Sequence, residues 1–333
     1  MQIAEYLRAE PDRMWDFAAQ MGVSRAVGRM PDGCMEETAR DIDKLAAMRR
    51  AFAERGFSLD VIEPAPPNQK LKMGIPGRDE ELETMAALVR NMGELGIGTL
   101  CYNWTVHFNW VRNRFDVRER GGALACGYRH ADWPQDELTE VGVVERETLW
   151  KNYAYFLDAI VPVAEKAGVN LAIHPSDPPV GSIRGVGRIF TSVADFERAM
   201  AMHPSPRHGI TMCQGTVRLM DDGADVPSAI RRLAPYIRFV HFRDVRGDKT
   251  DFHETFQDNG PTDMAECVRA YDEIGYDGPA RVDHVPTMAG EPTDTPGYAL
   301  LGRLYAVGYL KGLLEMSSSQ ANGTMNKQKG TCK

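Results

Sequence analysis

The chain alternates short apolar runs with longer segments in which apolar residues recur at helical spacing. Residues 24–30 predict a first strand, and residues 36–56 predict the helix that follows it. Within this helix Ile42, Leu45 and Met48 recur every three or four residues, with charged residues between them. This spacing is typical of an amphipathic helix that covers a core with one face. A strand followed by a helix is therefore the predicted repeating unit.

The same alternation predicts seven strands, most of them connected through a helix. The predicted strands are residues 24–30, 57–64, 98–104, 170–175, 209–215, 237–244 and 279–285. Helices between consecutive strands imply that the strands run parallel, with right-handed crossovers. The fold class is therefore α/β, as either a closed barrel or a doubly wound sheet.

The barrel is the favoured architecture. No G-x-G-x-x-G motif follows the first strand, which counts against a dinucleotide-binding sheet. An eighth strand is expected within residues 115–130, where the pattern is irregular. We therefore predict a single-domain (β/α)₈ TIM barrel over residues 1–316. Residues 317–333 are polar and predict a disordered C-terminal tail.

Composition and charge narrow the class of partner. The 333 residues are 43% hydrophobic and 26% charged, as in ordinary globular proteins, and α/β barrels often reach this length as one domain. The net charge of −8 gives no reason to expect binding to nucleic acid or to an anionic membrane. The six cysteines form no C-x-x-C pair, and no signal-peptide pattern is present, so a cytoplasmic location is expected.

Four predicted strands end in a residue that can bind a metal. These residues are His174, Cys213, His241 and Asp283. Each alone would more often be structural, because strand histidines and free cysteines are commonly buried. In a barrel, however, the carboxyl ends of the strands meet at one mouth. Two imidazoles, a thiolate and a carboxylate suit Mn²⁺, Fe²⁺, Co²⁺ or Zn²⁺ and are poor for Mg²⁺ or Ca²⁺. The four together predict a divalent metal site.

His284 is a further candidate, for proton transfer, because it follows Asp283 directly at the end of its predicted strand. Tyr298 opens the last predicted helix, and from the residues alone a packing role is favoured for it. His107 and His130 lie in the loop region after the third predicted strand and could line the mouth.

Several long motifs resemble the mannonate dehydratase family, which belongs to the xylose-isomerase-like group of TIM barrels. They are CYNW (101–104), AIHPSDPP (172–179), TMCQGT (211–216), VHFRD (240–244), RVDH (281–284) and PGYALLGRLYAVGYLKGL (296–313). The similarity extends from about the first strand to residue 315. It implies a Mn²⁺-type ion, with Fe²⁺ or Co²⁺ as alternatives, on the residues matching His174, Cys213, His241 and Asp283. It also implies that His284 and Tyr298 form the acid/base pair.

The family reaction removes water from D-mannonate and gives 2-keto-3-deoxy-D-gluconate, in the breakdown of hexuronic acids. The chain departs from the family pattern at pocket positions and keeps the metal set, so the departures bear on which aldonic acid is the substrate. They are Gly28 and Arg29 in place of a histidine pair, Asn109 in place of an aspartate, the loss of a histidine usual in the family near Gln257, and Val285 and Pro286 in place of Gly-His.

Two residues are predicted to bind the substrate. Arg243 lies two residues beyond His241, on the same side of the strand, and suits planar recognition of a carboxylate. Its alternative is a surface ion pair with an acid such as Asp244. Asn103, at the end of the third predicted strand, is a candidate for a substrate hydroxyl.

Three functions are compared. The first is a metal-dependent dehydratase of D-mannonate or another aldonic acid, and the second is an isomerase or epimerase of the same barrel group. Such isomerases commonly use paired strand-end carboxylates, whereas only Asp283 is recognised here. The third is a sugar-acid binding protein, against which the pair His284 and Tyr298 argues. The predicted partner is thus a small-molecule sugar acid, and a homodimer is allowed but not required.

Overall fold

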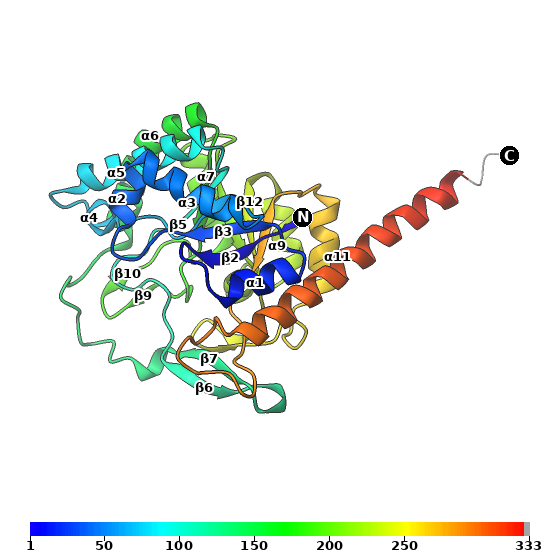
Figure 1. Cartoon of the computed structure of the whole chain (residues 1–333). Coiled ribbons are helices and arrows are strands. Elements are labelled where there is room, and N and C mark those ends of the chain that lie inside the picture. The colour runs from blue at the N-terminus through cyan, green and yellow to red at the C-terminus, as the bar shows by residue number, and fades with distance from the viewer. Residues whose placement is uncertain (330–333) are drawn as a thin grey trace.

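The computed structural model describes residues 1–329, and the side chains of residues 1–317. Nine parallel strands form one sheet that curls into a barrel, as Figure 1 shows. In sheet order the strands are β1 (Gln2–Ile3), β15 (Pro279–Val282), β12 (Ile237–Phe242), β11 (His208–Cys213), β8 (Asn170–His174), β5 (Thr99–Asn103), β4 (Ser58–Ile62), β3 (Arg25–Arg29) and β2 (Glu5–Arg8). β1 and β2 are consecutive parts of one segment, pairing with β15 and β3 respectively, so the sheet is nearly closed. The predicted TIM barrel is confirmed.

The eighth barrel strand lies at the N-terminus, and the prediction of a strand within residues 115–130 was wrong. β2 carries a buried charge, Glu5, which is neutralised by Arg303 from the last helix. That partner is distant in sequence, so the local pattern hides the strand. Residues 115–130 instead contribute to a separate antiparallel sheet. We call this sheet the accessory sheet. Its strands are β6 (Arg114–Arg118), β7 (Leu124–Arg129), β13 (Val245–Asp248) and β14 (Asp251–Glu254).

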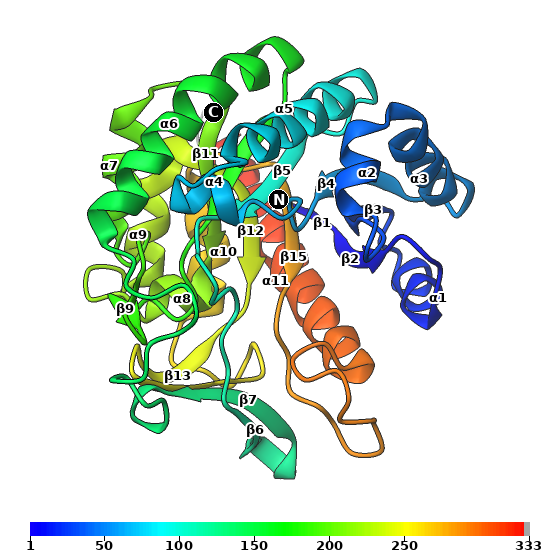
Figure 2. The ribbon, with the colours of Figure 1, turned by 90° about the vertical axis from the view of Figure 1, so that its left-hand side faces the viewer.

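Helices cover the outside of the barrel (Figure 2). They are α1 (Arg13–Gln20), α2 (Met35–Arg40), α3 (Ile42–Glu54), α4 (Gln69–Met73), α5 (Arg78–Glu94), α6 (Arg146–Ala167), α7 (Val193–Met202), α8 (Gln214–Arg218), α9 (Val226–Leu233), α10 (Met264–Glu273) and α11 (Leu300–Lys329). A short hairpin, β9 (Ser182–Ile183) and β10 (Val186–Gly187), follows β8. The predicted helix 36–56 is interrupted at Asp41, whose carboxylate accepts from the backbone N–H groups of Asp43 and Lys44 and so starts α3.

α11 continues past residue 317, the first residue of the predicted tail, and projects away from the barrel in Figure 1. Side chains from residue 318 onward and residues 330–333 lie outside the described part. The domain boundary at 316 therefore stays a prediction. Among the helices of residues 1–329, none combines the length and the apolar character of a membrane span.

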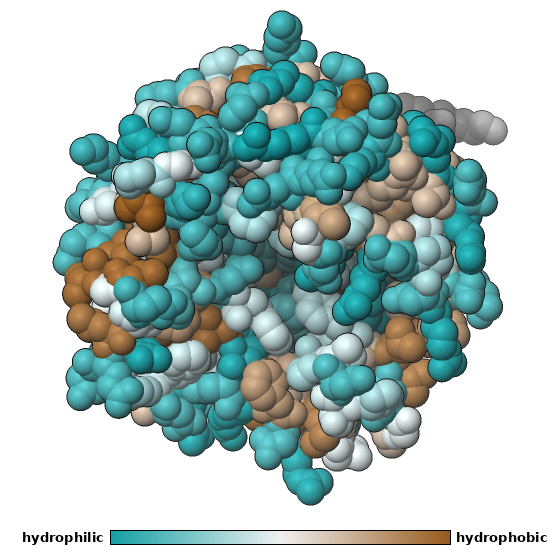
Figure 3. Space-filling view, turned by 60° about the vertical axis from the view of Figure 1, so that its left-hand side comes forward, coloured by the Kyte–Doolittle hydropathy of each residue, from teal (hydrophilic) through white to brown (hydrophobic). Residues whose placement is uncertain are grey.

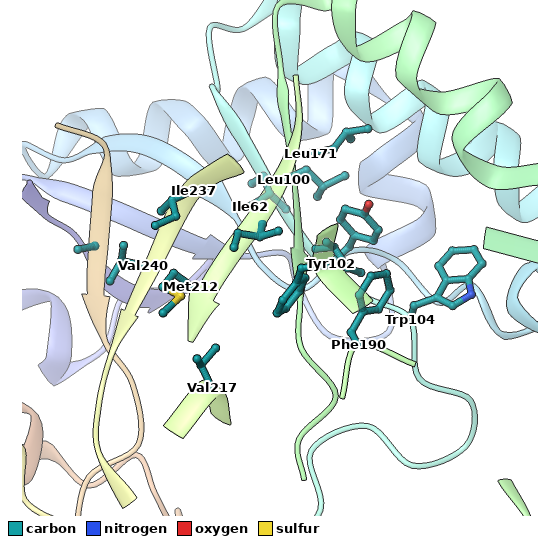
Figure 4. Close-up of a cluster of buried hydrophobic side chains, with 14 of the residues drawn as sticks. Ile62, Leu100, Tyr102, Trp104, Leu171, Phe190, Met212, Val217, Ile237 and Val240 are labelled. Carbon is teal, nitrogen blue, oxygen red and sulfur yellow. The ribbon is translucent and has the colours of Figure 1, made fainter. Parts of the chain in front are cut away.

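The apolar core has two layers, as expected for a barrel. Between strands and helices lies the larger layer, part of which Figure 4 shows around Leu100, Tyr102 and Trp104. A smaller cluster fills the barrel interior and consists of Ala4, Val27, Val61, Cys101, Ala172 and Phe239. Side chains thus fill the interior of the barrel, and only residues at the carboxyl ends of the strands can face an open mouth.

Candidate metal centre and active site

The carboxyl ends of β8, β11 and β12 bring three of the predicted metal ligands together. One donor atom from each of His174, Cys213 and His241 lies within 4.8 Å of the other two. His174 Nε2 is 3.2 Å from His241 Nδ1. Asp283 follows β15, and its Oδ2 atom lies 3.6 Å from the same His241 nitrogen. All four residues predicted from the strand ends therefore meet at one point.

The polar contacts of the two imidazoles show which nitrogens face each other. His174 Nδ1 donates to the Pro175 carbonyl at 2.7 Å, which leaves Nε2 facing His241. His241 Nε2 lies 3.3 Å from the Glu63 carboxylate and accepts from Arg281 Nε at 3.2 Å, so Nδ1 is the nitrogen that faces His174 and Asp283. Partners of this kind orient metal-binding histidines and select their tautomer.

The remaining two ligands are held as anions. Burial alone would raise the pKa of the Cys213 thiol, but the positive charge of Arg243 and the neighbouring His174 outweigh it and lower that pKa well below its usual value. Burial likewise opposes the charge of Asp283, and Arg281 lowers its pKa well below the ordinary range. Both carboxylate oxygens of Asp283 are buried, and each lies 2.8 Å from an arginine nitrogen, Oδ1 from Arg281 Nη1 and Oδ2 from Arg243 Nε, without a hydrogen bond of good geometry. Two imidazoles, a thiolate and a carboxylate are a donor set that fits a divalent transition metal.

A cavity of about 250 Å³ opens above these residues. It is lined by three of the proposed ligands, His174, His241 and Asp283, together with His284, Tyr298 and Asn103. On the side where the mouth lies, Figure 3 shows a surface that is hollowed near its centre and bordered mainly by hydrophilic residues. A polar cavity with charged groups at its base suits a small hydroxylated acid.

The two proton-transfer candidates are in contact in this cavity. The ring of Tyr298 meets the ring of His284 edge-on, with 5.2 Å between the ring centroids. On another side the Trp110 ring lies 4.8 Å from His284. His284 Nδ1 is 3.2 Å from Glu254 Oε1, a residue of the accessory sheet. The imidazole thus packs between two aromatic rings, and its Nδ1 atom lies beside the Glu254 carboxylate without a hydrogen bond of good geometry.

Arg243 does not face the cavity, although its position in the sequence predicted contact with the substrate. Its guanidinium is fully buried and bonds to three carboxylates, those of Asp177 at 2.6 Å, Glu254 at 2.8 Å and Asp283 at 2.8 Å. It does not line the cavity, and it is not a surface partner of Asp244, which instead accepts from Thr262. The structure therefore places Arg243 among the acids beneath the site and not at the cavity, contrary to the expectation of direct substrate binding.

Several residues of the site were not predicted. Glu63 follows β4, lines the cavity and pairs with Arg281 at 2.9 Å. The strand-end rule that identified His174 would also have identified Glu63, so Asp283 is not the sole strand-end carboxylate. Arg112 grips Asp177 through two hydrogen bonds of 2.8 and 2.9 Å. Its loop position gave no periodic signal that sequence reasoning could use.

The other histidine candidates lie away from the cavity, whereas two of the departures from the family pattern line it. His107 contacts Glu140 and His130 contacts Tyr128, and neither lines the cavity. Among the departures, Arg29 and Asn109 line the cavity. A Cβ atom on Gly28 would meet Leu59 at 2.4 Å, so this position faces the packed helix layer. Gln257 donates to the His284 carbonyl at 3.3 Å.

The near-closed parallel barrel, with His174, Cys213, His241 and Asp283 at its mouth, has the fold of the xylose-isomerase-like TIM-barrel proteins. A xylose isomerase domain protein from Planctomyces limnophilus shares the fold, with a TM-score of 0.64, 14% identity, and coverage of 95% of this chain and 98% of that one. Residues 16–141 and 132–324 match the family described as D-mannonate dehydratase (UxuA). The chain belongs to this family.

Individual relatives agree with this assignment. Mannonate dehydratase 2 of Halalkalibacterium halodurans is 34% identical over 306 residues, which cover 83% of this chain and 88% of that protein. The crystal structure of mannonate dehydratase from Streptococcus suis serotype 2 superposes with a TM-score of 0.86 at 29% identity, and covers 96% of both chains. The similarity thus extends over the barrel and the site, and the chain is a hydro-lyase by family.

Proposed function

We propose that this chain dehydrates D-mannonate to 2-keto-3-deoxy-D-gluconate, a step in the breakdown of hexuronic acids. The observation that carries the proposal is the convergence of the metal-binding set with His284 and Tyr298 in one small polar cavity. A binding protein needs no such proton-transfer pair, and family membership favours the dehydratase over an isomerase.

The metal would be held by His174, Cys213, His241 and Asp283. We propose Mn²⁺, with Fe²⁺ or Co²⁺ as alternatives, since this donor set mixes nitrogen, sulfur and oxygen. When bound, the metal supplies Lewis-acid stabilisation of the charge that develops on the substrate carboxylate and the adjacent oxygen. Asn103, which also lines the cavity, would bind a substrate hydroxyl.

The chain's own side chains move the protons. His284 takes the proton from C2 at Nε2, while Glu254 stabilises the opposite nitrogen at 3.2 Å. Burial and the charge of Asp283 raise the pKa of Tyr298 above its ordinary value, so the phenol retains its proton at neutral pH. Tyr298 then donates that proton to the departing C3 hydroxyl. Loss of H⁺ from C2 and OH⁻ from C3 releases one water and leaves an enol, which becomes the 2-keto acid.

The proposal is tested by supplying the Mn²⁺-loaded protein with a panel of aldonic acids and analysing the products by mass. Loss of one water from D-mannonate is the expected result. An unchanged mass with a new retention time would indicate an isomerase, and no turnover of any acid would indicate a binding protein. Preference for another aldonic acid would point to Arg29 and Asn109, the departures that line the cavity.

Two wider expectations belong with this function. All cysteines within the described range are free thiols, which supports a reducing, cytoplasmic location. A homodimer is the oligomeric state that we would test first by light scattering.

A further inference from the structure

Lys72 is a buried lysine to which the reaction proposed above assigns no role. It lies on α4, and its side chain is only 3% exposed. Its ammonium group donates to Asn103 Oδ1 at 2.9 Å and to the Thr105 carbonyl at 3.2 Å. Burial lowers the pKa of Lys72 to about 7, against a weaker opposing effect of Glu81. Burying a lysine side chain costs free energy, so its contacts are expected to serve a purpose.

α4 is fixed firmly enough to aim this side chain. Glu81 of α5 accepts from the Leu71 N–H at 2.7 Å, and Asn152 of α6 donates to the Lys72 carbonyl at 2.9 Å. Gly74 ends the helix with φ of 69°, and a Cβ atom there would meet Asn152 at 2.6 Å. The helix is thus pinned to two neighbouring helices, and Lys72 points towards the loop after β5.

The contacts of Asn103 define which way its amide faces. Its Oδ1 atom receives three hydrogen bonds, from Lys72 Nζ at 2.9 Å, the Thr105 hydroxyl at 2.9 Å and the Thr105 N–H at 3.3 Å. The Thr105 backbone N–H can only donate, so the oxygen of Asn103, and not its NH₂ group, must occupy this position. No acceptor for Asn103 Nδ2 is found among the described residues. Since Asn103 lines the cavity, its NH₂ group is available to a bound molecule.

We propose that Lys72 is a positioning residue that locks the Asn103 amide, so that its NH₂ group donates to a hydroxyl oxygen of the bound sugar acid. The proposal rests on the function above, because it takes the ligand to be an aldonic acid. Lys72 itself touches no substrate, since it does not line the cavity. It acts only through Asn103, and this restriction makes the idea testable.

The test is a double-mutant cycle of Lys72→Met and Asn103→Ala in the Mn²⁺-loaded protein. KM and kcat are measured for D-mannonate, and its Kd is measured by calorimetry. Lys72→Met should raise KM and Kd about tenfold, with a smaller change in kcat, because one substrate hydrogen bond is lost. In the Asn103→Ala background the same change should alter Kd less than about twofold. The control Lys70→Met, at an exposed position of the same helix, should match the wild type.

Other outcomes separate this inference from the proposed function. If D-mannonate is turned over and Lys72→Met raises Kd equally in both backgrounds, Lys72 is merely structural and the inference is overturned. Binding with the predicted coupling but without dehydration would support the inference and contradict the proposed function. Failure of the wild type to bind any aldonic acid would overturn both. Should Lys72→Met not fold, Thr105→Val removes the second donor at 2.9 Å and must show the same dependence on Asn103.

Discussion

Glu254 reaches His284 from outside the barrel, and its Oε1 atom lies 3.2 Å from His284 Nδ1. Glu254 belongs to β14 of the accessory sheet and is completely buried. Arg112 and Arg243 hold its two carboxylate oxygens at 2.5 and 2.8 Å. The accessory sheet therefore supplies the group that fixes the proposed base, while the barrel supplies the proposed metal ligands.

The first prediction is that Glu254→Gln lowers kcat about 10- to 100-fold, as outer partners of active-site histidines commonly do. The amide keeps the shape but presents a donor as readily as an acceptor to His284. KM for D-mannonate should change little, since Glu254 does not line the cavity. Steady-state kinetics measure the effect, and Asp251→Asn, an exposed change on the same strand, is the control. An unaltered kcat would reduce Glu254 to a purely structural role.

The second prediction concerns the buried position of Arg243. Arg243→Met leaves Asp177, Glu254 and Asp283 without a shared counter-charge, which should cost about 3–5 kcal/mol of unfolding free energy. The exposed control Arg246→Met should stay within about 0.5 kcal/mol of the wild type. Urea unfolding measures both. Equal stability of the two variants, with only KM raised, would restore the substrate-binding role expected from the sequence.

The third prediction is a pH dependence of stability at His208. Burial lowers its pKa to about 4, and it is held neutral by donating to the His203 carbonyl and accepting from Tyr153. In the unfolded chain its pKa is about 6.5, so between these values only the unfolded state takes up the proton. The stabilisation is complete above pH 6.5 and is lost as the pH falls towards 4. It amounts to at most about 3 kcal/mol.

Urea unfolding at several pH values between 7 and 4 measures this effect. His208→Gln should flatten the loss of stability within that window, whereas His203→Gln, at a partly exposed position, should leave it as in the wild type. Parallel pH profiles of the wild type and His208→Gln would show that His208 is protonated equally in both states.

The barrel was predictable because its signal is local. Compact apolar strands such as 209–215 and 237–244 alternate with amphipathic helices, and each strand signal depends only on its own residues. β2 was not predictable in this way, because its buried Glu5 is neutralised by Arg303 at the other end of the chain. A pattern of polar and apolar residues contains no information about such a partner.

The residues of the site also divide into those that a local sequence pattern predicts and those that it does not. His174, Cys213 and His241 share one rule, since each lies at the carboxyl end of a barrel strand, where the mouth is. Arg112 and Glu254 come from a loop and from the accessory sheet, which no periodicity connects to the barrel. Arg243 was predicted to bind the substrate because residues two apart on a strand lie on the same side, but the structure places it away from the cavity. Its three acidic partners come from separate segments, and their presence decides whether an arginine is buried or free.

The fourth prediction tests the thiolate ligand. Cys213→Ser should weaken Mn²⁺ binding markedly while the metal-free protein keeps nearly its original melting temperature, because the hydroxyl is a poorer ligand of similar size. Calorimetry with Mn²⁺ and thermal unfolding measure the two effects. Cys267→Ser, a buried cysteine outside the cavity, is the matched control and should bind Mn²⁺ as the wild type does. Equal affinities in both variants would mean that Cys213 is only a packing residue.

His284 and Tyr298 are proposed to transfer the protons in the dehydration of D-mannonate. The most direct test is kcat for 2-keto acid formation by the wild type, His284→Asn and Tyr298→Phe, each loaded with the same amount of Mn²⁺. General acid–base groups typically contribute ~10²–10⁴-fold, so each variant should lose activity by that order while still binding the metal. Near-full activity in either variant would contradict the account, and that residue would then be part of the packing.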